Sequence, residues 1–236
     1  MKNKKNLLLS LFGIFALLLF FSSCKKDDNN NQTPTPTYPS TVTDIDGNVY
    51  HTIKIGNQVW LKENLKVTKY RNGDPIENVT SDAEWSTKNT GAYCNYENEA
   101  SNGNTYGKLY NWYALNDSRN IAPAGWHVPS ESEWKTMIDY LGGESQAGGK
   151  LKENSLNYWS TPNYLATNSS GFTALPGGGR NQDGIFNSKG LNGIFWTSSE
   201  YDNTFAWLRI LSYDKADINK NEYYKKWGAS VRLIKD

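Results

Sequence analysis

The chain has 236 residues, with 25 lysines and arginines against 24 aspartates and glutamates, and 14% of its residues are aromatic. This near-neutral balance lacks the excess of positive charge that nucleic-acid binding requires, which argues against a nucleic acid as partner. The two cysteines are too few for the disulfide framework of a small secreted domain.

The first segment has the pattern of an export signal. Three lysines among the first five residues precede an apolar run over residues 7–21, which is the order of charge and apolar length in a secretory signal. As a helix this run spans about 22 Å, less than the roughly 30 Å hydrocarbon core of a membrane. A cleaved signal is therefore preferred over a permanent membrane-spanning helix.

The apolar run ends at Cys24, in the sequence FSSC, where two serines give a peptidase access to the bond before the cysteine. FSSC resembles the lipobox of bacterial lipoproteins. The resemblance implies a signal peptide over residues 1–23 and a lipid thioether on Cys24 with fatty acyl groups such as palmitate, which bind the chain to a membrane. The alternative is an ordinary signal peptide with a chance cysteine.

The next residues predict a tether and a location. KKDDNNN, residues 25–31, resembles the surface-export signal of lipoproteins in the Bacteroidetes group, which implies display on the outside of the outer membrane; a solvated spacer is the alternative. Residues 25–40 contain no aliphatic side chain, so they cannot bury enough surface to offset the entropy of ordering. We expect a lipidated cysteine and flexible tether over residues 24–41 and a single domain over residues 42–236.

The start of this domain predicts an antiparallel meander. Apolar residues alternate with polar ones from Val42 to Leu61, and Asp46-Gly47 and Gly56-Asn57 are turn dipeptides. DIDGN, residues 44–48, shares features with a calcium loop, but its glycine falls two places early and the distal glutamate is missing. A hairpin turn is preferred, and no metal site is predicted.

Two helices are predicted next. Residues 104–117 repeat apolar side chains at spacings of three and four. Residues 129–143 carry stronger signals, because Ser130 is a suitable N-cap, Glu133 completes a capping box, and Gly142 supplies a left-handed stop. The buried face of this second helix is expected to contain Trp134, Met137, Ile138 and Leu141.

The remaining sequence is rich in glycine and asparagine, and long irregular loops are expected from about residue 143. Short strands are predicted near residues 172–175, 194–197, 205–211 and 230–234. Such loops persist in a compact domain when a function uses them or when aromatic side chains hold them in place. The nine tryptophans of the chain could serve that purpose.

Six stretches of this domain carry a family resemblance. They are GNQVWLKENL, NGNTYGKLYNWYAL, IAPAGWHVPSESEW, GFTALPGGGR, FWTSSEYDNTFAWLRIL and GASVRLIKD. In this order, over essentially all of residues 42–236, they resemble the Fibrobacter succinogenes major paralogous domain. The function of that family is poorly defined, so the resemblance bears on architecture more than on activity.

A more distant similarity concerns the fold. GWHVPSESEW resembles the start of a helix in the formylglycine-generating enzyme group, and SVRLIKD stands where that group has its closing strand. This implies an α+β, C-type-lectin-like fold with two main helices, a small twisted antiparallel sheet, pairing of the first and last strands, and long irregular loops. The copper-binding cysteine pair of those enzymes and the calcium motifs of sugar-binding C-type lectins are missing, so neither chemistry is carried over and no cofactor is expected.

Three reactive side chains are interpreted as structural. Cys94 lies among aromatic residues without a histidine nearby in sequence, which favours a buried thiol over a nucleophile. His51 and His127 show no zinc-ligand spacing, and His127 is expected to make a hydrogen bond at the start of the second helix.

Two segments contain the candidate ligand-binding residues. In PGGGRNQDG, residues 176–184, Arg180 is expected to donate to carbonyls or a carboxylate rather than to form a phosphate site, because the P-loop ending is missing. FWTSSEYDNTFAWLR, residues 195–209, combines apolar plates with short polar groups, as sugar rings or peptides require. The predicted ligand-binding residues are Arg180, Trp196, Ser198, Ser199, Glu200, Asp202, Asn203 and Trp207.

These residues leave three functional hypotheses. The preferred one is a non-catalytic binding or adhesion module for a glycan or a protein, with no catalytic residue. Its rivals are an enzyme, either of the formylglycine-generating fold class or a divergent glycosidase that uses Glu200 and Asp202 as its carboxylates, and a structural component of the envelope.

Overall fold

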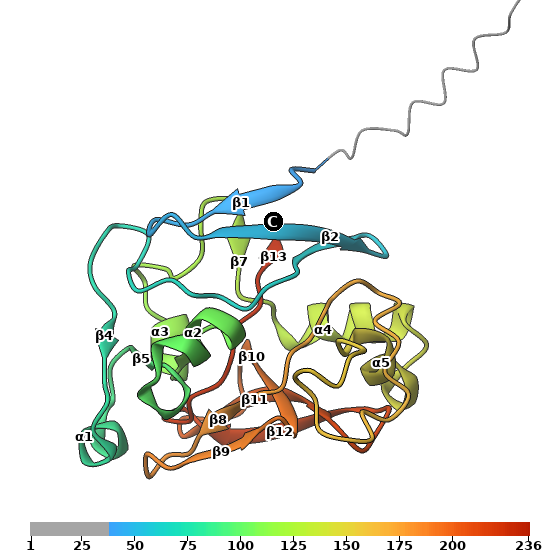
Figure 1. Cartoon of the computed structure of the whole chain (residues 1–236). Coiled ribbons are helices and arrows are strands. Elements are labelled where there is room, and N and C mark those ends of the chain that lie inside the picture. Colours follow the sequence, from blue (N-terminus) through green and yellow to red (C-terminus); the bar gives the residue numbers. More distant parts are fainter. Residues whose placement is uncertain (1–37) are drawn as a thin grey trace, which may run out of the picture. The chain divides into compact units, whose positions relative to one another are not determined.

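The structure, a computed structural model, describes residues 38–236, so the predicted signal peptide, Cys24 and most of the predicted tether lie outside it. The described residues form strands in four sheets (Figure 1). The first sheet has the order β1 (Thr41–Thr43), β2 (Val49–Ile55), β3 (Gln58–Leu61), β13 (Ile234–Lys235) and β7 (Trp126–His127), and the second has the order β10 (Asn192–Glu200), β11 (Phe205–Ser212) and β12 (Ile218–Tyr224). The smaller sheets are β4 (Glu77–Asn78), β5 (Ala92–Cys94) and β6 (Leu109–Tyr110), and the hairpin β8 (Gly177–Arg180) and β9 (Phe186–Lys189).

The helices are short and lie between the sheets in the chain. They are α1 (Asp82–Thr87), the 3-10 helix η1 (Tyr96–Asn98), α2 (Ala100–Tyr106), α3 (Trp112–Leu115), α4 (Glu131–Tyr140) and α5 (Glu144–Leu151). Within residues 38–236, no helix has the length and apolar character needed to cross a membrane.

The predicted meander at the start of the domain is confirmed. β1 pairs with β2 and β2 with β3, both antiparallel, and the connecting turns contain the predicted dipeptides Asp46-Gly47 and Gly56-Asn57. Both glycines adopt positive φ, +85° and +61°, a conformation that glycine reaches without steric cost. The prediction of a hairpin turn at residues 44–48 is also confirmed, because the Asp44 carboxylate accepts the backbone N–H groups of Asp46 and Asn48.

The C-terminal strand pairs with the N-terminal meander, through the third strand β3 rather than the first strand β1. In β13, Ile234 is opposite Trp60 of β3 on one side and His127 of β7 on the other. The backbone N–H of Leu61 donates to the carbonyl of Leu233 at 3.0 Å. The last strand therefore closes the sheet that the first strands begin, as the top of Figure 1 shows.

One of the two predicted helices is confirmed. In α4, the Ser130 hydroxyl accepts the Glu133 N–H while the Glu133 carboxylate accepts the Ser130 N–H, which is the predicted capping box. The single helix predicted over residues 104–117 is wrong. Gly107 adopts φ +78° and ends α2, after which β6 pairs with β5 and α3 begins. The spacing of apolar residues there reflects burial on both a strand and a helix.

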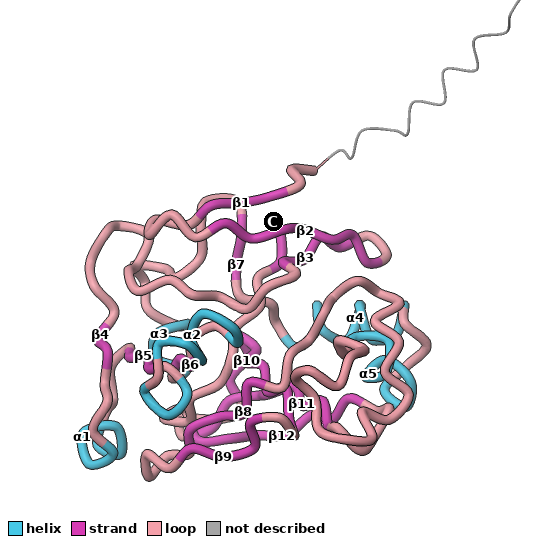
Figure 2. Tube along the Cα trace, in the orientation of Figure 1, coloured by secondary structure: helices cyan, strands magenta, loops and turns pink. Residues whose placement is uncertain are grey.

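The predicted α+β, C-type-lectin-like fold with two main helices is wrong, because the described residues are mostly β-structure. The segment expected to be loop-rich from residue 143 contains β8 to β12, drawn in magenta in the lower part of Figure 2. Two of its predicted short strands lie within β10 and β11, whereas residues 172–175 form only an isolated bridge at Ala174. Strand β12 was not predicted, because much of it is exposed and its sequence INKNEYY is therefore mostly polar.

The glycine-rich segment PGGGR was predicted to be part of a loop because glycine is uncommon in strands. Gly177 to Arg180 form β8, and a Cβ on Gly179 would stand 2.7 Å from Trp227 Nε1. The backbone at residue 179 lies so close to that ring that only glycine fits there. The strand forms although glycine has a low intrinsic preference for strands.

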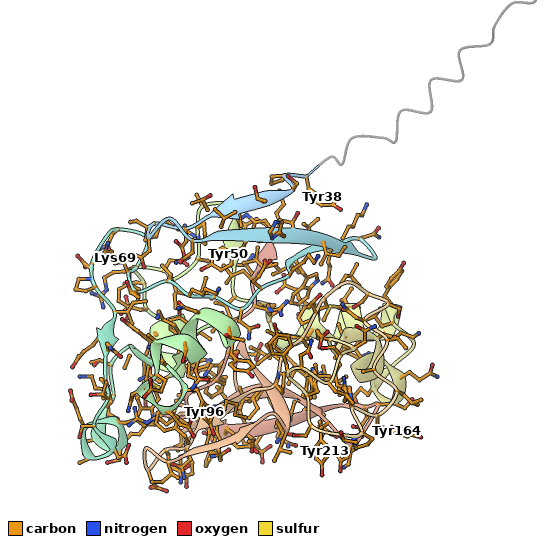
Figure 3. All side chains as sticks on the ribbon, in the orientation of Figure 1. Tyr38, Tyr50, Lys69, Tyr96, Tyr164 and Tyr213 are labelled. Carbon is orange, nitrogen blue, oxygen red and sulfur yellow. The ribbon has the colours of Figure 1, made fainter. Side chains whose placement is uncertain are left out.

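The core is divided into three clusters of apolar side chains. The largest lies between the first sheet and the inner face of the second, and includes Tyr50, which Figure 3 labels on β2. The Tyr50 hydroxyl donates to the Asp44 carboxylate at 2.7 Å and accepts the backbone N–H of Lys66 at 2.9 Å, so this buried polar atom is satisfied.

Candidate functional site

The candidate site is built where β10 and β11 are joined by residues 201–204. The Asp202 carboxylate accepts hydrogen bonds from the backbone N–H groups of Thr204 and Phe205 at 2.7 and 2.8 Å. The backbone N–H of Tyr201 donates to the carbonyl of Phe205 at 3.0 Å. These bonds fix the turn and hold Tyr201 beside the strand that follows.

Strand register brings further aromatic residues to the same place. Phe205 is opposite Tyr224 and Trp207 is opposite Glu222 in the β11–β12 pair, and opposed residues of an antiparallel pair point to one face of the sheet. The rings of Phe205 and Tyr224 are 4.5 Å apart. Tyr201 packs edge to face on Trp207, with ring centroids 4.8 Å apart and an interplanar angle of 83°.

We call this surface the aromatic face; it consists of Tyr201, Phe205, Trp207, Lys220, Glu222 and Tyr224. Tyr201 and Tyr224 expose 53% and 43% of their surface, and Trp207 is half-buried. The Lys220 Nζ lies 4.0 Å from the centroid of the Trp207 ring. A ligand at this face would meet flat apolar rings with an ammonium group and a carboxylate beside them.

Helices α4 and α5 set the limit of the aromatic face. Arg209, the next residue of β11 on the same face, is buried and donates to the carboxylates of Glu131 and Glu144. These glutamates are the first residues of α4 and α5. The helices therefore cover the sheet beyond Arg209 and leave Trp207 and its neighbours uncovered.

The two predicted tryptophans of the site lie on opposite faces of the sheet. Trp196 is opposite Leu208 in the β10–β11 register and is fully buried. Its indole N–H donates to the carbonyl of Tyr110 at 2.8 Å. Trp196 thus belongs to the core, whereas Trp207 belongs to the aromatic face.

The predicted polar residues between these tryptophans mainly hold the turn and its surroundings. The Ser198 N–H donates to the carbonyl of Pro129, and the Ser199 hydroxyl accepts the N–H of Glu131. The Glu200 carboxylate is 2.9 Å from the ammonium of Lys225, a buried lysine that also donates to the carbonyl of Asn203. With Asp202 these residues position the aromatic face without forming one cluster on it.

Arg180 lies apart from the aromatic face and is fully buried. Its guanidinium donates to the carbonyls of Val79, Thr80 and Gly184 and to the Asp82 carboxylate. The prediction that Arg180 binds carbonyls or a carboxylate is therefore confirmed, and this side chain has no surface free for a ligand.

Sequence reasoning missed most of the aromatic face. Tyr201, Phe205, Lys220, Glu222 and Tyr224 were not predicted, because β12 was not recognised and its register with β11 decides which side chains meet. The signal that could have found them is the spacing of two that relates Phe205 to Trp207 and relates Lys220, Glu222 and Tyr224, when the two stretches are taken as neighbouring strands.

The remaining reactive side chains have structural roles. Burial raises the pKa of the Cys94 thiol to about 12, so the prediction of a buried structural cysteine is confirmed. His127 lies between the Glu133 carboxylate at 2.8 Å and the Asp236 carboxylate at 2.6 Å. Since Glu133 belongs to the capping box of α4, the predicted hydrogen bond at the start of this helix is confirmed. Within residues 38–236, no three His, Cys, Asp or Glu side chains are grouped as metal ligands.

Comparisons with known proteins found one match. A family model described as the Fibrobacter succinogenes major domain matches residues 53–235, which is most of the described chain. No curated protein and no solved structure matches the chain.

Proposed function

Because the chain belongs to the Fibrobacter succinogenes major domain family, we propose that it is an outer-membrane lipoprotein whose residues 42–236 form a non-catalytic module that binds glycan through the aromatic face. The signal peptide is residues 1–23, and the lipidated Cys24 with the tether to residue 41 connects the module to the membrane. The sequence support for this part of the proposal is the lipobox-like FSSC and the acidic, amidic residues after it.

The observation that carries the binding proposal is the exposed aromatic surface around Trp207. The apolar face of a sugar ring packs on a flat aromatic ring, and polar groups beside the ring fix its orientation. Lys220 and Glu222 supply a donor and an acceptor next to Trp207. Glycan is preferred over a protein partner because charged groups, Lys220 and Glu222, stand directly beside the Trp207 ring, whereas the centre of a protein interface is depleted of charged residues.

The contacts of the nearby carboxylates support binding without turnover. A glycosidase needs two carboxylates across the scissile bond, one of them protonated as general acid. Here Glu200 is paired with the Lys225 ammonium, and Asp202 accepts two backbone N–H groups of its own turn. Both carboxylates are therefore engaged in holding the loop.

The experiment is affinity electrophoresis of the purified lipoprotein in gels containing soluble polysaccharides, with a parallel assay for new reducing ends. We expect saturable retardation by at least one polysaccharide and no product. Trp207→Ala should abolish the retardation, and Tyr140→Ala, which removes a 67% exposed ring at the end of α4, should leave it unchanged. Product formation would support the enzyme hypothesis instead, and equal losses in both variants would remove the aromatic face from the proposal.

The location is tested separately. Intact cells that display the protein outward should lose it to added trypsin, and a Cys24→Ser chain should no longer fractionate with the membrane. Protection from trypsin in intact cells, together with release on lysis, would place the protein inside the outer membrane and contradict surface display.

A further inference from the structure

Three arginines are buried among the described residues, and one of them differs from the others. Arg180 pairs with Asp82, and Arg209 pairs with Glu131 and Glu144. Arg232 is only 1% exposed, yet among residues 38–236 no carboxylate accepts a hydrogen bond from it. A buried cation is costly unless an anion compensates its charge. An anion bound next to Arg232 would therefore stabilise the folded protein.

The hydrogen bonds of Arg232 leave part of its capacity unused. Nε donates to Asn64 Oδ1 at 2.6 Å, Nη1 donates to the carbonyls of Leu61 and Phe172 at 2.9 and 2.7 Å, and Nη2 donates to the carbonyl of Thr173 at 3.1 Å. A guanidinium has five N–H donors. One N–H of Nη2 thus has no acceptor within the described part of the chain.

The Arg232 side chain lines a cavity of about 170 Å³. Other residues of its wall are Lys62, Glu63, Lys66, Thr105 and Thr173. The cavity is smaller than the roughly 300 Å³ of the smallest pockets for drug-sized ligands, so it suits an ion or one terminal group of a larger molecule.

The charges around this cavity are predominantly positive. Arg232, Lys62 and Lys66 contribute three cationic groups, whereas Glu63 is the one carboxylate of the wall. Both oxygens of Glu63 are engaged by His51, one with the ring Nδ1 and one with the backbone N–H, each at 2.8 Å. The Lys66 ammonium donates to the carbonyl of Asn104 at 2.7 Å, while the Lys62 ammonium has no hydrogen bond or ion pair among the described residues.

We propose that this cavity is a binding site for an oxyanion, either a free ion or the acidic group of a larger ligand. The Nη2 N–H of Arg232 and the Lys62 ammonium supply charge-assisted donors, and the Thr105 hydroxyl in the cavity wall is a neutral donor. The buried guanidinium is held rigidly by its four other hydrogen bonds, so it is positioned before an anion arrives. This site is separate from the aromatic face and does not depend on the proposed glycan binding.

The test uses the full lipidated chain in detergent. Phosphate, sulfate and acetate are added at constant ionic strength with chloride as the balancing anion, and the melting temperature is recorded together with the amide NMR shifts of Asn64 and Thr173. An anion that binds the folded state raises the melting temperature by mass action. We expect a saturable rise and saturable shifts at both amides with at least one of these anions.

Variants locate the effect. Arg232 is unsuitable because its removal would take a hydrogen bond from four acceptors, three of them buried, so Lys62→Gln combined with Lys66→Gln is used, and Lys54→Gln on β2 is the matched control. The double substitution should weaken the apparent affinity by about tenfold or more, which corresponds to at least about 1.4 kcal/mol, and the control should not. Glucuronate distinguishes the source of the anion: binding of glucuronate but none of the free ions assigns the site to an acidic sugar. Absence of saturation with all four anions, or equal weakening in the control, would overturn the proposal.

Discussion

The ammonium of Lys220 lies 4.0 Å from the centroid of the Trp207 ring and 3.7 Å from the Glu131 carboxylate. This one side chain therefore stands at the border between the half of the sheet that α4 and α5 cover and the half that they leave open. Glu131 also receives Arg209 from the covered half. The first turns of these two helices cover the sheet at Arg209, and the aromatic face is the part of the same sheet surface that they leave exposed to solvent.

The two tryptophans predicted for the site should respond differently to substitution. Trp196→Ala empties a fully buried position and removes one of the two hydrogen bonds to the Tyr110 carbonyl, which also accepts the Ala229 N–H, so the free energy of unfolding should fall by about 3–5 kcal/mol. Trp207→Ala removes an edge-to-face contact and a cation–π contact at a half-buried site, which should cost about 1–2 kcal/mol. Urea denaturation measures both; a greater loss for Trp207→Ala would contradict the assignment of Trp196 to the core.

Arg209 should contribute more to stability than an exposed ion pair on the same helix. Arg209→Met leaves the Glu131 carboxylate, 20% exposed, with only the Lys220 ammonium at 3.7 Å, and we expect a loss of about 2–3 kcal/mol, below the about 3–5 kcal/mol typical of fully buried pairs. The control is Lys135→Met, which breaks the pair with Asp139 on α4, where both side chains are more than half exposed. This control should cost at most about 0.5 kcal/mol. Equal losses in urea denaturation would mean that the buried arginine gains nothing from its carboxylates.

The elements that the sequence predicted correctly are those whose signals are local. The capping box needs only Ser130 and Glu133, three residues apart, and the meander needs only alternation and two glycine dipeptides. The Arg180 contacts were also predictable in kind, because a buried guanidinium must find carbonyls or a carboxylate.

What the sequence could not supply depends on contacts between distant segments. Gly107 ends α2 within a stretch whose apolar spacing fits a continuous helix, and β8 forms from glycines because Trp227 lies against it. The aromatic face depends on the register between β11 and β12, and a shift by one residue would turn Trp207 to the opposite side. That no described carboxylate accepts a hydrogen bond from Arg232 is likewise visible only when its partners are known.

The N-cap of α4 should be measurable by a single substitution. Ser130→Ala removes the hydroxyl that accepts the Glu133 N–H, and the loss in free energy of unfolding should be about 1 kcal/mol. Ser145→Ala is the control, because Ser145 is exposed in the first turn of α5, a helix with no side-chain cap. A variant as stable as the control would show that the reciprocal bond, donated by the residue 130 N–H to the Glu133 carboxylate, is sufficient to hold the start of the helix.

Stability should depend on pH through His127. Burial by itself lowers the pKa of His127, but its hydrogen bonds to Asp236 and Glu133 outweigh burial, so the pKa lies above its ordinary value. The protonated ring then stabilises the folded state fully below the ordinary pKa of about 6.5, and this contribution is lost as the pH rises through the raised value. The free energy of unfolding should therefore fall as the pH rises from the ordinary His pKa through the raised pKa of His127.

Variants separate this contribution from other titrating groups. His127→Gln should lack this part of the pH dependence, and Asp236→Asn, which removes one of the two carboxylates, should move the fall to lower pH. Identical pH profiles for the three chains in urea denaturation would contradict the assignment.

Thiol counting tests the lipid anchor and the buried cysteine together. Cys94 is fully buried and its thiol pKa is raised by burial to about 12, so it should react slowly with Ellman's reagent in the folded protein, since the thiolate is the reactive form. If Cys24 carries a lipid thioether, chains unfolded in urea should titrate with one thiol each, and the Cys94→Ala variant should show none. Two thiols per unfolded wild-type chain would mean that Cys24 is unmodified, and the membrane anchor, with outward display, would then have to be abandoned while the aromatic face and the oxyanion cavity remained as properties of the folded module.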